Sequence, residues 1–198
     1  MEIDPQDLGN RERYRLMTAS LIPRPIAWLS TVDAHGRANL APFSFFGGVS
    51  SHPPTVMVSI GPRRGQPKDT AKNLMATGEA VIHIPHRSLA EKMVTTSAEV
   101  GSEVDEFDLA GLTKVASVLV EPPRVAEAAI AMEAKVVHHQ HVGSAPMDLF
   151  LLELLRFHFD DAVIKDGMPD AMTLGVVGRL GGQEYCETAA VFEIPRPL

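Results

Sequence analysis

The chain has 198 residues, of which 45% are apolar, and its 18 basic and 25 acidic side chains give a formal net charge of −7. This length and composition predict a single globular domain over residues 1–198. The negative charge argues against a nucleic-acid partner. Cys186 is the only cysteine, which excludes an intramolecular disulfide and a zinc site built from cysteines.

We expect no targeting signal or membrane-spanning segment. Its start, Met1-Glu-Ile-Asp-Pro5, has neither the charged nor the apolar region of a secretory signal. No apolar run approaches the roughly 20 residues of a membrane-spanning helix, and the longest candidate, residues 149–155, is interrupted by Glu153. We therefore expect a soluble, cytoplasmic protein that does not bind a membrane.

Two strand-like segments come first along the chain. Residues 25–32 and 37–46 flank the turn Asp33-Ala-His-Gly36, and this arrangement predicts a β-hairpin. The second strand leads into an aromatic loop, which Gly47-Gly48 closes. We therefore expect the hairpin to present aromatic side chains and backbone groups at this loop.

A strand and a short helix follow the hairpin. Side chains alternate in direction over residues 55–60, as in a strand. Residues 69–77 then predict a helix, which Asp69 or Thr70 is expected to cap at its start. Gly78 is expected to take the left-handed conformation at the helix end.

The middle of the chain predicts a second helix and an irregular segment. Ser88-Leu-Ala-Glu91 matches a capping box, which favours a helix over residues 89–96. Residues 97–114 are rich in Glu, Asp, Ser and Gly and predict an irregular excursion. We expect Phe107 and Leu109 to anchor this excursion.

Further strands are expected over residues 79–85, 128–142 and 149–160, and residues 184–194 are expected to close the sheet after a glycine-rich loop at residues 175–182. Several strands with few helices predict a mainly β protein, namely an antiparallel Greek-key β-barrel with helical insertions. Little alternation of strand and helix disfavours a doubly wound parallel sheet.

The tripeptide Lys68-Asp-Thr70 opens the first predicted helix. A helix start offers free N–H groups and a positive dipole end, so these residues present amides, a hydroxyl and an ammonium to a phosphate. The alternative is a helix that Asp69 merely caps, with Lys68 in solvent. Residues 61–68 lack the Gly-Lys-Ser/Thr ending of a phosphate loop, which disfavours an NTPase.

The segment Asn39-Leu-Ala-Pro-Phe-Ser44 contains small and rigid residues that let a flat ring approach the backbone. Such a ring needs donors and acceptors along its polar edge and an apolar surface elsewhere. The groups that offer these are the backbone of residues 41–45 with Ser30, Thr31 and Ser44 for the polar edge, and Trp28 or Phe43 for the apolar surface. The alternative is that the aromatic side chains fill the core, which we favour for Phe45 and Phe46.

Three histidines, His138, His139 and His141, invite comparison with a metal site. On a strand, His139 and His141 share one face and His138 points to the other, so at most two can meet one ion. No carboxylate or cysteine spacing completes a ligand set. We therefore expect exposed strand histidines and no metal.

The glycine-rich loop at residues 175–182 differs from the G-x-G-x-x-G dinucleotide fingerprint and does not lie between a first strand and a helix. The sequence therefore shows no separate Rossmann site for NAD. No Ser-His-Asp or Cys-His arrangement emerges either. Both observations are compatible with chemistry that resides in a bound cofactor.

Segments spread over nearly the whole chain carry a resemblance whose specificity comes from their order and spacing. They are Tyr14, Ile22-Pro-Arg-Pro25, residues 39–46, Ser51-His-Pro-Pro54, Lys68-Asp-Thr70, Glu106-Phe-Asp-Leu-Ala-Gly-Leu112, Pro123-Arg-Val125, Gly178-Arg-Leu-Gly-Gly182 and Tyr185. Together they resemble the flavin-reductase-like family, whose members hold FMN on a split β-barrel. Gly47 and Ala134 depart from this pattern, since family members often have Asn and Cys there.

The resemblance implies a homodimer that binds FMN non-covalently near the subunit interface. Arg179 is a candidate for the side of the second substrate. The expected cofactor-binding residues are Trp28, Ser30, Thr31, Asn39, Ala41, Pro42, Phe43, Ser44 and Ser59 along the flavin, with Lys68, Asp69 and Thr70 around the phosphate.

The implied activity is that of an NAD(P)H-dependent flavin reductase, which passes hydride or electrons from transiently bound NAD(P)H through FMN to an acceptor. That acceptor can be a redox protein or a monooxygenase. No catalytic side chain is expected, because the chemistry belongs to flavin N5. One alternative is an electron carrier resembling flavoredoxin, whose tightly bound FMN is reduced by a protein partner, and another is a flavin-binding module without turnover.

Overall fold

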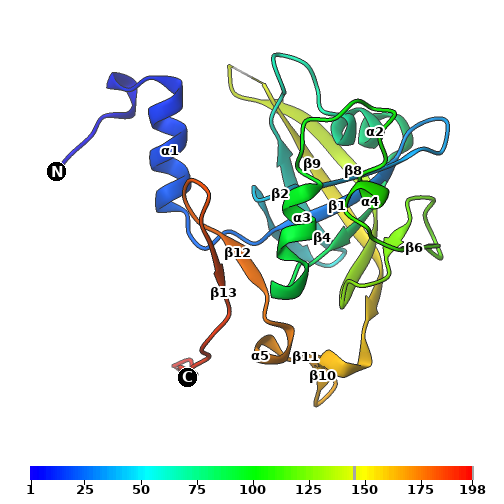
Figure 1. Cartoon of the computed structure of the whole chain (residues 1–198). Coiled ribbons are helices and arrows are strands. Elements are labelled where there is room, and N and C mark those ends of the chain that lie inside the picture. Colours follow the sequence, from blue (N-terminus) through cyan, green and yellow to red (C-terminus); the bar gives the residue numbers. More distant parts are fainter. Residues whose placement is uncertain (145, 198) are drawn as a thin grey trace.

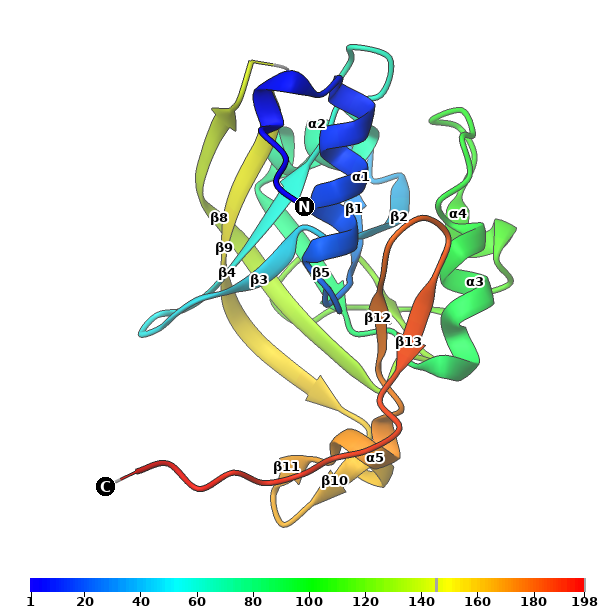
Figure 2. The same ribbon diagram turned by 90° about the vertical axis from the view of Figure 1, so that its left-hand side faces the viewer.

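The computed structural model of the protein describes residues 1–144 and 146–197, and its centre is a seven-stranded antiparallel sheet. The strand order is β2-β1-β5-β8-β9-β4-β3, and the sheet curves around an apolar interior (Figures 1 and 2). Its strands are β1 (Ala27–Val32), β2 (Ala38–Phe43), β3 (Phe46–Ser51), β4 (Pro54–Ile60), β5 (Glu79–His83), β8 (Ile130–Val142) and β9 (Met147–Phe159).

Helices and two-stranded sheets surround this sheet. The helices are α1 (Asn10–Ser20), α2 (Asp69–Thr77), α3 (Ala90–Thr95), α4 (Glu106–Leu109) and α5 (Ala171–Leu174), with 3₁₀ turns η1 (Pro5–Asp7), η2 (Arg87–Leu89) and η3 (Asp161–Val163). The small sheets pair β6 (Lys114–Val115) with β7 (Arg124–Val125), β10 (Ile164–Lys165) with β11 (Met168–Pro169), and β12 (Val177–Arg179) with β13 (Tyr185–Glu187). None of these helices, over the residues described, has both the length and the apolar character that crossing a bilayer requires.

The turn between β1 and β2 is held by its own polar side chain. Asp33 Oδ1 accepts hydrogen bonds from the backbone N–H groups of His35 and Arg37, and Gly36 takes a positive φ of 78°. The Arg37 amide is the largest influence on Asp33 and helps to lower the pKa of this carboxyl to about 2. This turn fixes the register in which β2 lies against β1.

Two apolar clusters share the two faces of β1. Ala27 and Leu29 face the interior of the curved sheet, where they meet side chains from β4, β5, β8, β9 and α2. Trp28 faces the other way and packs with Met93 of α3 and Phe107 of α4. Successive side chains of β1 point to opposite faces, so this strand packs against both the interior of the sheet and the helices outside it.

The sheet stays open between its two edges. Strand β2 ends at Phe43 and β3 begins at Phe46, yet these two strands form opposite edges of the sheet. The two residues between them, Ser44 and Phe45, therefore carry the chain across the opening. The end of β2 lies near residues that follow β4, since Phe43 lines the same cavity as Pro62 and Lys68.

The main expectations from the sequence are confirmed. The protein is mainly β and antiparallel. The hairpin at residues 25–46, the helix at residues 69–77 and the long strands near residues 128–142 and 149–160 all form, with small changes of boundary. Gly78 takes a left-handed conformation with φ of 69° at the end of α2.

Two expectations about elements are wrong, and one helix was not predicted at all. Helix α1 was not expected, because Thr18 is its only buried residue and its sequence has no clear apolar stripe. Residues 46–51 form the edge strand β3 and not a loop, since Gly47 and Gly48 pair with β4. Residues 184–194 do not close the large sheet: β13 turns back at Gly182, which has a positive φ, and pairs with β12 alone among the described residues.

The expected caps and one expected anchor also differ. Lys68 occupies the N-cap position of α2, in place of Asp69 or Thr70. Ser88 does not cap the helix after it, because its hydroxyl lies 3.0 Å from Nδ1 of His86. Phe107 is fully buried as expected, whereas Leu109 is 45% exposed because the single turn of α4 buries Glu106 and Phe107.

Candidate functional site

A cavity of about 390 Å³ lies where β2, the start of α2 and the segment after α3 meet. Its size falls within the usual range for pockets that bind small molecules. The side chains around it include both cations and small polar groups. They are Asn39, Ala41, Pro42, Phe43, Pro62, Arg63, Arg64, Lys68, Asp69, Thr70, Thr96, Ser97, Ala98, Glu99, Val100 and Glu106.

The start of α2 lies on the wall of this cavity, where Lys68, Asp69 and Thr70 line it. Lys68 is the N-cap residue, and its side chain makes no capping hydrogen bond. The first N–H groups of a helix have no partner within the helix, and the helix dipole adds a partial positive charge there. Asp69 also lies in this turn, but its carboxylate pairs with Lys72 at 2.8 Å. The helix start therefore remains able to bind an anion.

Lys68 adds a full positive charge to the same place. Its Nζ lies 5.4 Å from the centre of the Phe43 ring. Although the residue as a whole is exposed, protein atoms around the ammonium exclude water, and this desolvation together with the nearby charge of Arg63 lowers the pKa of Lys68. The ammonium is thus partly desolvated and close to a second cation, which favours binding of an anion.

Thr70 is positioned by a chain of hydrogen bonds. Asn39 Nδ2 donates to Thr70 Oγ1 at 2.9 Å, and Asn73 Nδ2 donates to Thr31 Oγ1 at 3.1 Å. Asn39 also lies 3.4 Å from Thr31 Oγ1, which joins the two pairs. Because Thr70 Oγ1 already accepts from Asn39, its hydroxyl hydrogen can be donated to a ligand.

Glu106 lies on the wall of the same cavity. The N–H of Leu40 donates to its carboxylate at 3.1 Å. Burial raises the pKa of Glu106, although this hydrogen bond acts in the opposite direction. The carboxyl therefore holds the edge strand β2 in place, and its acidity is weaker than that of an ordinary glutamate.

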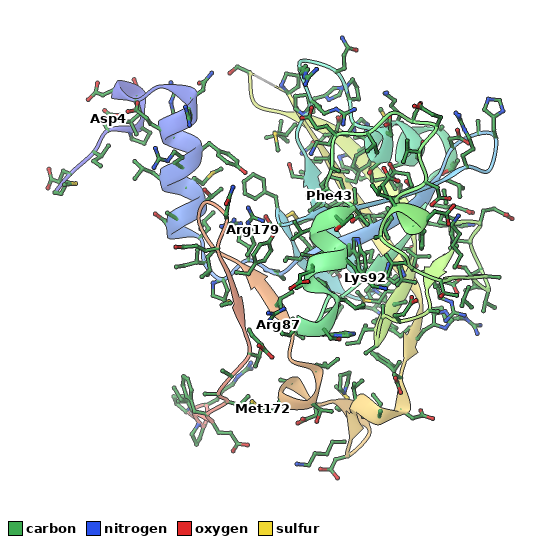
Figure 3. All side chains as sticks on the ribbon, viewed as in Figure 1. Asp4, Phe43, Arg87, Lys92, Met172 and Arg179 are labelled. Atoms are coloured by element: carbon green, nitrogen blue, oxygen red, sulfur yellow. The ribbon has the colours of Figure 1, made fainter. Side chains whose placement is uncertain are left out.

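A second cavity of about 320 Å³ adjoins the first and shares Pro42, Phe43 and Ser97 with it. It lies between the sheet and the outer elements α1 and β12, and Figure 3 shows Phe43 and Arg179 among the side chains there. The side chains around it are Tyr14, Arg15, Thr18, Arg24, Ile26, Pro42, Phe43, Ser44, Met93, Ser97, Arg179, Leu180, Gly182 and Tyr185.

Arginines hold the outer wall of the second cavity together. Arg24 is buried and donates to the carbonyl oxygens of Leu21 and Leu180 and to Ser44 Oγ at 2.8, 2.9 and 3.3 Å. Arg179 stacks on the Tyr185 ring, 4.4 Å from its centre, and donates to the hydroxyl of that residue. Arg24 thus links the end of α1, the loop after β12 and the end of β2 into one wall.

The structure places most of the predicted site residues around these two cavities. Those around the first are Asn39, Ala41, Pro42, Phe43, Lys68, Asp69 and Thr70, and those around the second are Pro42, Phe43, Ser44 and Arg179. Two segments that are distant in the sequence, the end of β2 and the start of α2, are therefore brought together.

Four predicted residues lie around neither cavity. Trp28 is fully buried in the core, where its Nε1 donates to Thr96 Oγ1 at 2.9 Å. Ser30 and Thr31 are also fully buried. Ser30 Oγ is the one buried side-chain oxygen or nitrogen in the described part of the chain that lacks a hydrogen-bond partner. Ser59 lies on β4, where its backbone N–H donates to Phe45.

Several residues around the cavities were not expected from the sequence. Arg63 comes from the loop after β4, and Arg15 and Arg24 come from α1 and the segment after it. No local pattern marks Arg15 or Arg63, since only the fold brings them to the cavities, whereas Arg24 lies in the segment Ile22-Pro-Arg-Pro25 that carried the family resemblance. Glu106 and Tyr185 do lie in segments that carried the family resemblance, and this was the available signal for them.

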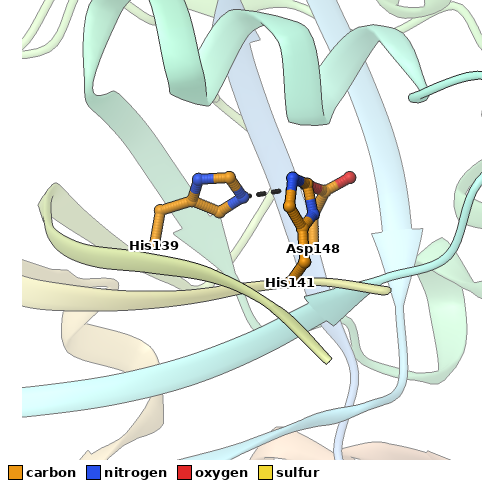
Figure 4. Close-up of side chains that lie close together, drawn as sticks. All are labelled: His139, His141 and Asp148. Carbon is orange, nitrogen blue, oxygen red and sulfur yellow. Dashed lines mark hydrogen bonds and ion pairs between the residues drawn. The ribbon is translucent and has the colours of Figure 1, made fainter. Parts of the chain in front are cut away.

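The expectation that no carboxylate accompanies the strand histidines is wrong. Asp148 lies 2.9 Å from His139 Nε2 and 3.1 Å from His141 Nδ1 (Figure 4). Strands β8 and β9 pair so that His141 is directly opposite Asp148. Strand pairing thus brings the Asp148 carboxylate next to the histidines, although Asp148 lies on the next strand, after the turn that joins β8 to β9. His138 lies on the other face, as expected.

A family model described as "Flavin reductase like domain" matches residues 18–173. The chain belongs to this family. The matched region contains the whole seven-stranded sheet, the first cavity and the start of α2. Arg179 and Tyr185 of the second cavity lie beyond it.

Solved structures of flavin-reductase-like proteins are similar over most of the chain. Component B of nitrilotriacetate monooxygenase from Bacillus cereus is 33% identical, with a TM-score of 0.94 and 98% of each chain covered. A protein of Shewanella frigidimarina, described as a putative flavin reductase with a split barrel domain, is 25% identical, with a TM-score of 0.87 over 100% of both chains. Flavoredoxin of Desulfovibrio vulgaris is 25% identical, with a TM-score of 0.77, and the match covers 87% of this chain and 91% of that one.

These similarities confirm that the open, curved sheet is a split barrel of the flavin-reductase-like type. The residues around the two cavities also suit a flavin. The uncapped start of α2 and Lys68 match a phosphate. The segment Ala41-Pro-Phe-Ser44, which lies between the cavities, offers backbone groups and the Phe43 ring to a flat ring system.

Proposed function

We propose that the protein binds FMN non-covalently and acts as an NAD(P)H-dependent flavin reductase. The observation that carries this proposal is that the two cavities share Pro42, Phe43 and Ser97 in their walls, with the start of α2 beside one cavity and arginines around the other. Such a pocket suits a flat ring with a phosphate tail and an anionic second substrate beside it.

In this proposal the phosphate lies at the start of α2. The N–H groups of the first turn, the Lys68 ammonium and the Thr70 hydroxyl donate to its oxygens, while Arg63 adds charge from the loop after β4. Asn39 keeps Thr70 in the orientation that leaves the hydroxyl hydrogen free to donate. The flavin ring then lies along Ala41-Pro-Phe-Ser44, and the family resemblance is the support for this orientation.

The second cavity is proposed to receive the reduced nicotinamide nucleotide. The phosphates of this nucleotide carry negative charge, and Arg15 and Arg179 supply positive charge at the wall of the second cavity. When FMN is bound, it supplies the hydride-accepting chemistry, and the protein supplies binding and orientation. Tyr185 holds the Arg179 guanidinium in place by stacking and by its hydroxyl.

A second candidate function is electron transfer without a nicotinamide substrate. The similarity to flavoredoxin from Desulfovibrio vulgaris favours this alternative. A protein partner would then reduce tightly held FMN, and the second cavity would receive part of that partner. The two candidates share the same FMN site and differ in the source of electrons.

We further propose a cytoplasmic homodimer with the flavin near the subunit interface. Large apolar side chains are exposed on α1 and on β9, among them Leu16, Met17, Phe157 and Phe159. Such side chains are typical of surfaces that a second subunit covers. The similarity to a monooxygenase component supports a monooxygenase as one acceptor of reduced flavin.

Anaerobic reduction of the FMN-loaded protein tests the proposed activity. NADH and NADPH are added separately, and the visible absorbance of the oxidised flavin is followed. Rapid bleaching with either nucleotide supports the reductase. No bleaching with either, together with reduction by a ferredoxin-type donor, would reject the reductase and favour the electron carrier.

A further inference from the structure

The side-chain cluster of His139, His141 and Asp148 lies at the end of the β8–β9 hairpin. In the sheet, His141 pairs with Asp148 and His139 pairs with Phe150, so all four side chains share one face. Asp148 also pairs with Ile60 of β4, which is fully buried. The cluster therefore lies where the apolar interior of the curved sheet reaches the hairpin end.

The three side chains converge on one point. Asp148 Oδ1 lies 2.9 Å from His139 Nε2 and 3.1 Å from His141 Nδ1, and all three possible ligand atoms lie within 4.8 Å of one another. Figure 4 shows the His139 ring directed toward Asp148, with His141 beside the carboxylate. Among residues 1–144 and 146–197, no other group of three or more His, Cys, Asp or Glu side chains is arranged in this way.

The surroundings hold two of these ligands in place and leave one side open. The Asp148 side chain is only 4% exposed and that of His139 is 26% exposed, whereas that of His141 is 63% exposed. The His139 ring stacks on Phe150, with 4.5 Å between the ring centres and 17° between the planes. The site is therefore rigid on its inner side, and water can reach it past His141.

The spacing of the atoms matches the demands of a transition-metal ion. Bonds of about 2.0–2.1 Å from a tetrahedral zinc ion place neighbouring ligand atoms about 3.3 Å apart. The two distances to Asp148 are shorter than this by only a few tenths of an ångström. Two neutral imidazoles and one carboxylate form a ligand set that Zn²⁺ and related ions accept, with water in the remaining position.

The alternative is that both histidines serve only to pair the carboxylate. Both rings must then be N–H donors to the same oxygen, although one imidazole is enough to pair one carboxylate. A strand places side chains two residues apart on one face, so His-x-His opposite an Asp presents three ligands without any change of backbone. The convergence of a second, exposed imidazole on the same oxygen favours metal binding.

We propose that His139, His141 and Asp148 bind one divalent first-row transition-metal ion per chain. None of the three residues lies around the two cavities described above. The site is therefore a second binding site on the protein, and its existence does not depend on flavin binding. An ion at this position links β8 to β9 beside the turn of their hairpin.

Zn²⁺ binding to the full chain, prepared without a histidine tag, tests this proposal. Equilibrium dialysis with metal analysis is expected to give one Zn²⁺ per chain, both with and without added FMN. Co²⁺ in place of Zn²⁺ is expected to give visible absorption bands of a low-symmetry, four-coordinate or five-coordinate site. His141→Asn and Asp148→Asn are each expected to weaken Zn²⁺ binding by at least about tenfold.

His138→Asn is the matched control, because His138 is an exposed neighbour on the opposite face of the same strand. This variant is expected to bind Zn²⁺ as the unchanged protein does. His141→Asn changes an exposed side chain, and circular dichroism checks that it folds. The proposal is overturned if the unchanged chain binds no stoichiometric Zn²⁺, or if His141→Asn and His138→Asn bind it equally well.

Discussion

The ammonium of Lys68 lies over the ring of Phe43, 5.4 Å from its centre. Lys72, one turn further along α2, pairs instead with the carboxylate of Asp69 at 2.8 Å. An aromatic ring restrains an ammonium with about 0.5–1 kcal/mol at an exposed site without neutralising its charge. The two lysines therefore differ in their surroundings: Lys68 lies over an aromatic ring, and Lys72 pairs with an acidic neighbour.

Replacing Lys68 tests its part in FMN binding. Lys68→Met removes the charge and keeps much of the side-chain length, and we expect FMN affinity to fall by about 1–3 kcal/mol, which corresponds to a charge-assisted hydrogen bond. Fluorescence titration with FMN measures the effect. Lys72→Met is the matched control and is expected to change the affinity little. Equal effects of the two substitutions would show that only general charge matters.

Thr70→Val tests the hydroxyl that Asn39 orients. The variant keeps the β-branched shape but loses the donor to the phosphate, so we expect FMN binding to weaken by about 1 kcal/mol or somewhat more. Riboflavin, which has no phosphate, is expected to bind the variant and the unchanged protein alike. Thr77→Val, at the other end of α2 and away from both cavities, serves as the control. Unchanged FMN affinity in Thr70→Val would remove this hydroxyl from the site.

Arg15→Met tests the second cavity. Arg15 is exposed on α1, so the substitution leaves the buried contacts of Arg24 in place. We expect a higher KM for NADH or NADPH and an unchanged dissociation constant for FMN, since the charge acts on the second substrate. Arg179→Met is expected to act in the same direction, although it also removes the contact with Tyr185. A change in FMN affinity with no change in KM would show that the second cavity binds FMN and not the nicotinamide nucleotide.

The pH dependence of stability is expected to report on His83, which is fully buried between two backbone groups. Its Nδ1 lies 3.0 Å from the carbonyl oxygen of Trp28, and the N–H of Val125 donates to its Nε2 at 2.9 Å. These partners fit the neutral ring with its proton on Nδ1. Burial lowers the pKa of His83 from 6.5 to about 4, although the bond to Trp28 acts in the opposite direction.

Because the folded protein holds this proton less tightly than the unfolded chain, the contribution of His83 to stability is complete above about pH 6.5 and is lost as the pH falls toward 4. The shift corresponds to roughly 3 kcal/mol of unfolding free energy. Urea unfolding of the unchanged protein and of His83→Gln across this range measures it. His83→Gln is expected to be less stable at pH 7 but to lose less stability on acidification. Parallel pH profiles would assign the acid sensitivity to other groups.

Local patterns were sufficient to predict the first hairpin, helix α2 and the role of Gly78. The turn at Asp33 and the left-handed residue at Gly78 are set by neighbours in the sequence, so their conformations follow from short-range chemistry. Local patterns could not predict that Lys68 and Asn39 line the same cavity, because this depends on how α2 packs against β2. Only the family resemblance predicted it.

Features that depend on long-range contacts were not predictable from local patterns. Arg15 reaches the second cavity because Arg24 binds the end of α1 to the loop near Leu180, a contact across more than half of the chain. Asp148 joins the histidines because of the register between β8 and β9, which includes two irregularities. Trp28 shows the opposite error: an aromatic side chain near a predicted site proved to be part of the core.

Titration of the purified protein with FMN, followed by flavin fluorescence and by sedimentation of the bound cofactor with the protein, tests the central claim most directly. We expect saturable binding of one FMN per chain, with riboflavin bound more weakly because it lacks the group that Lys68 and the start of α2 recognise. A well-folded protein that binds no FMN, or that binds riboflavin and FMN equally, would contradict the account.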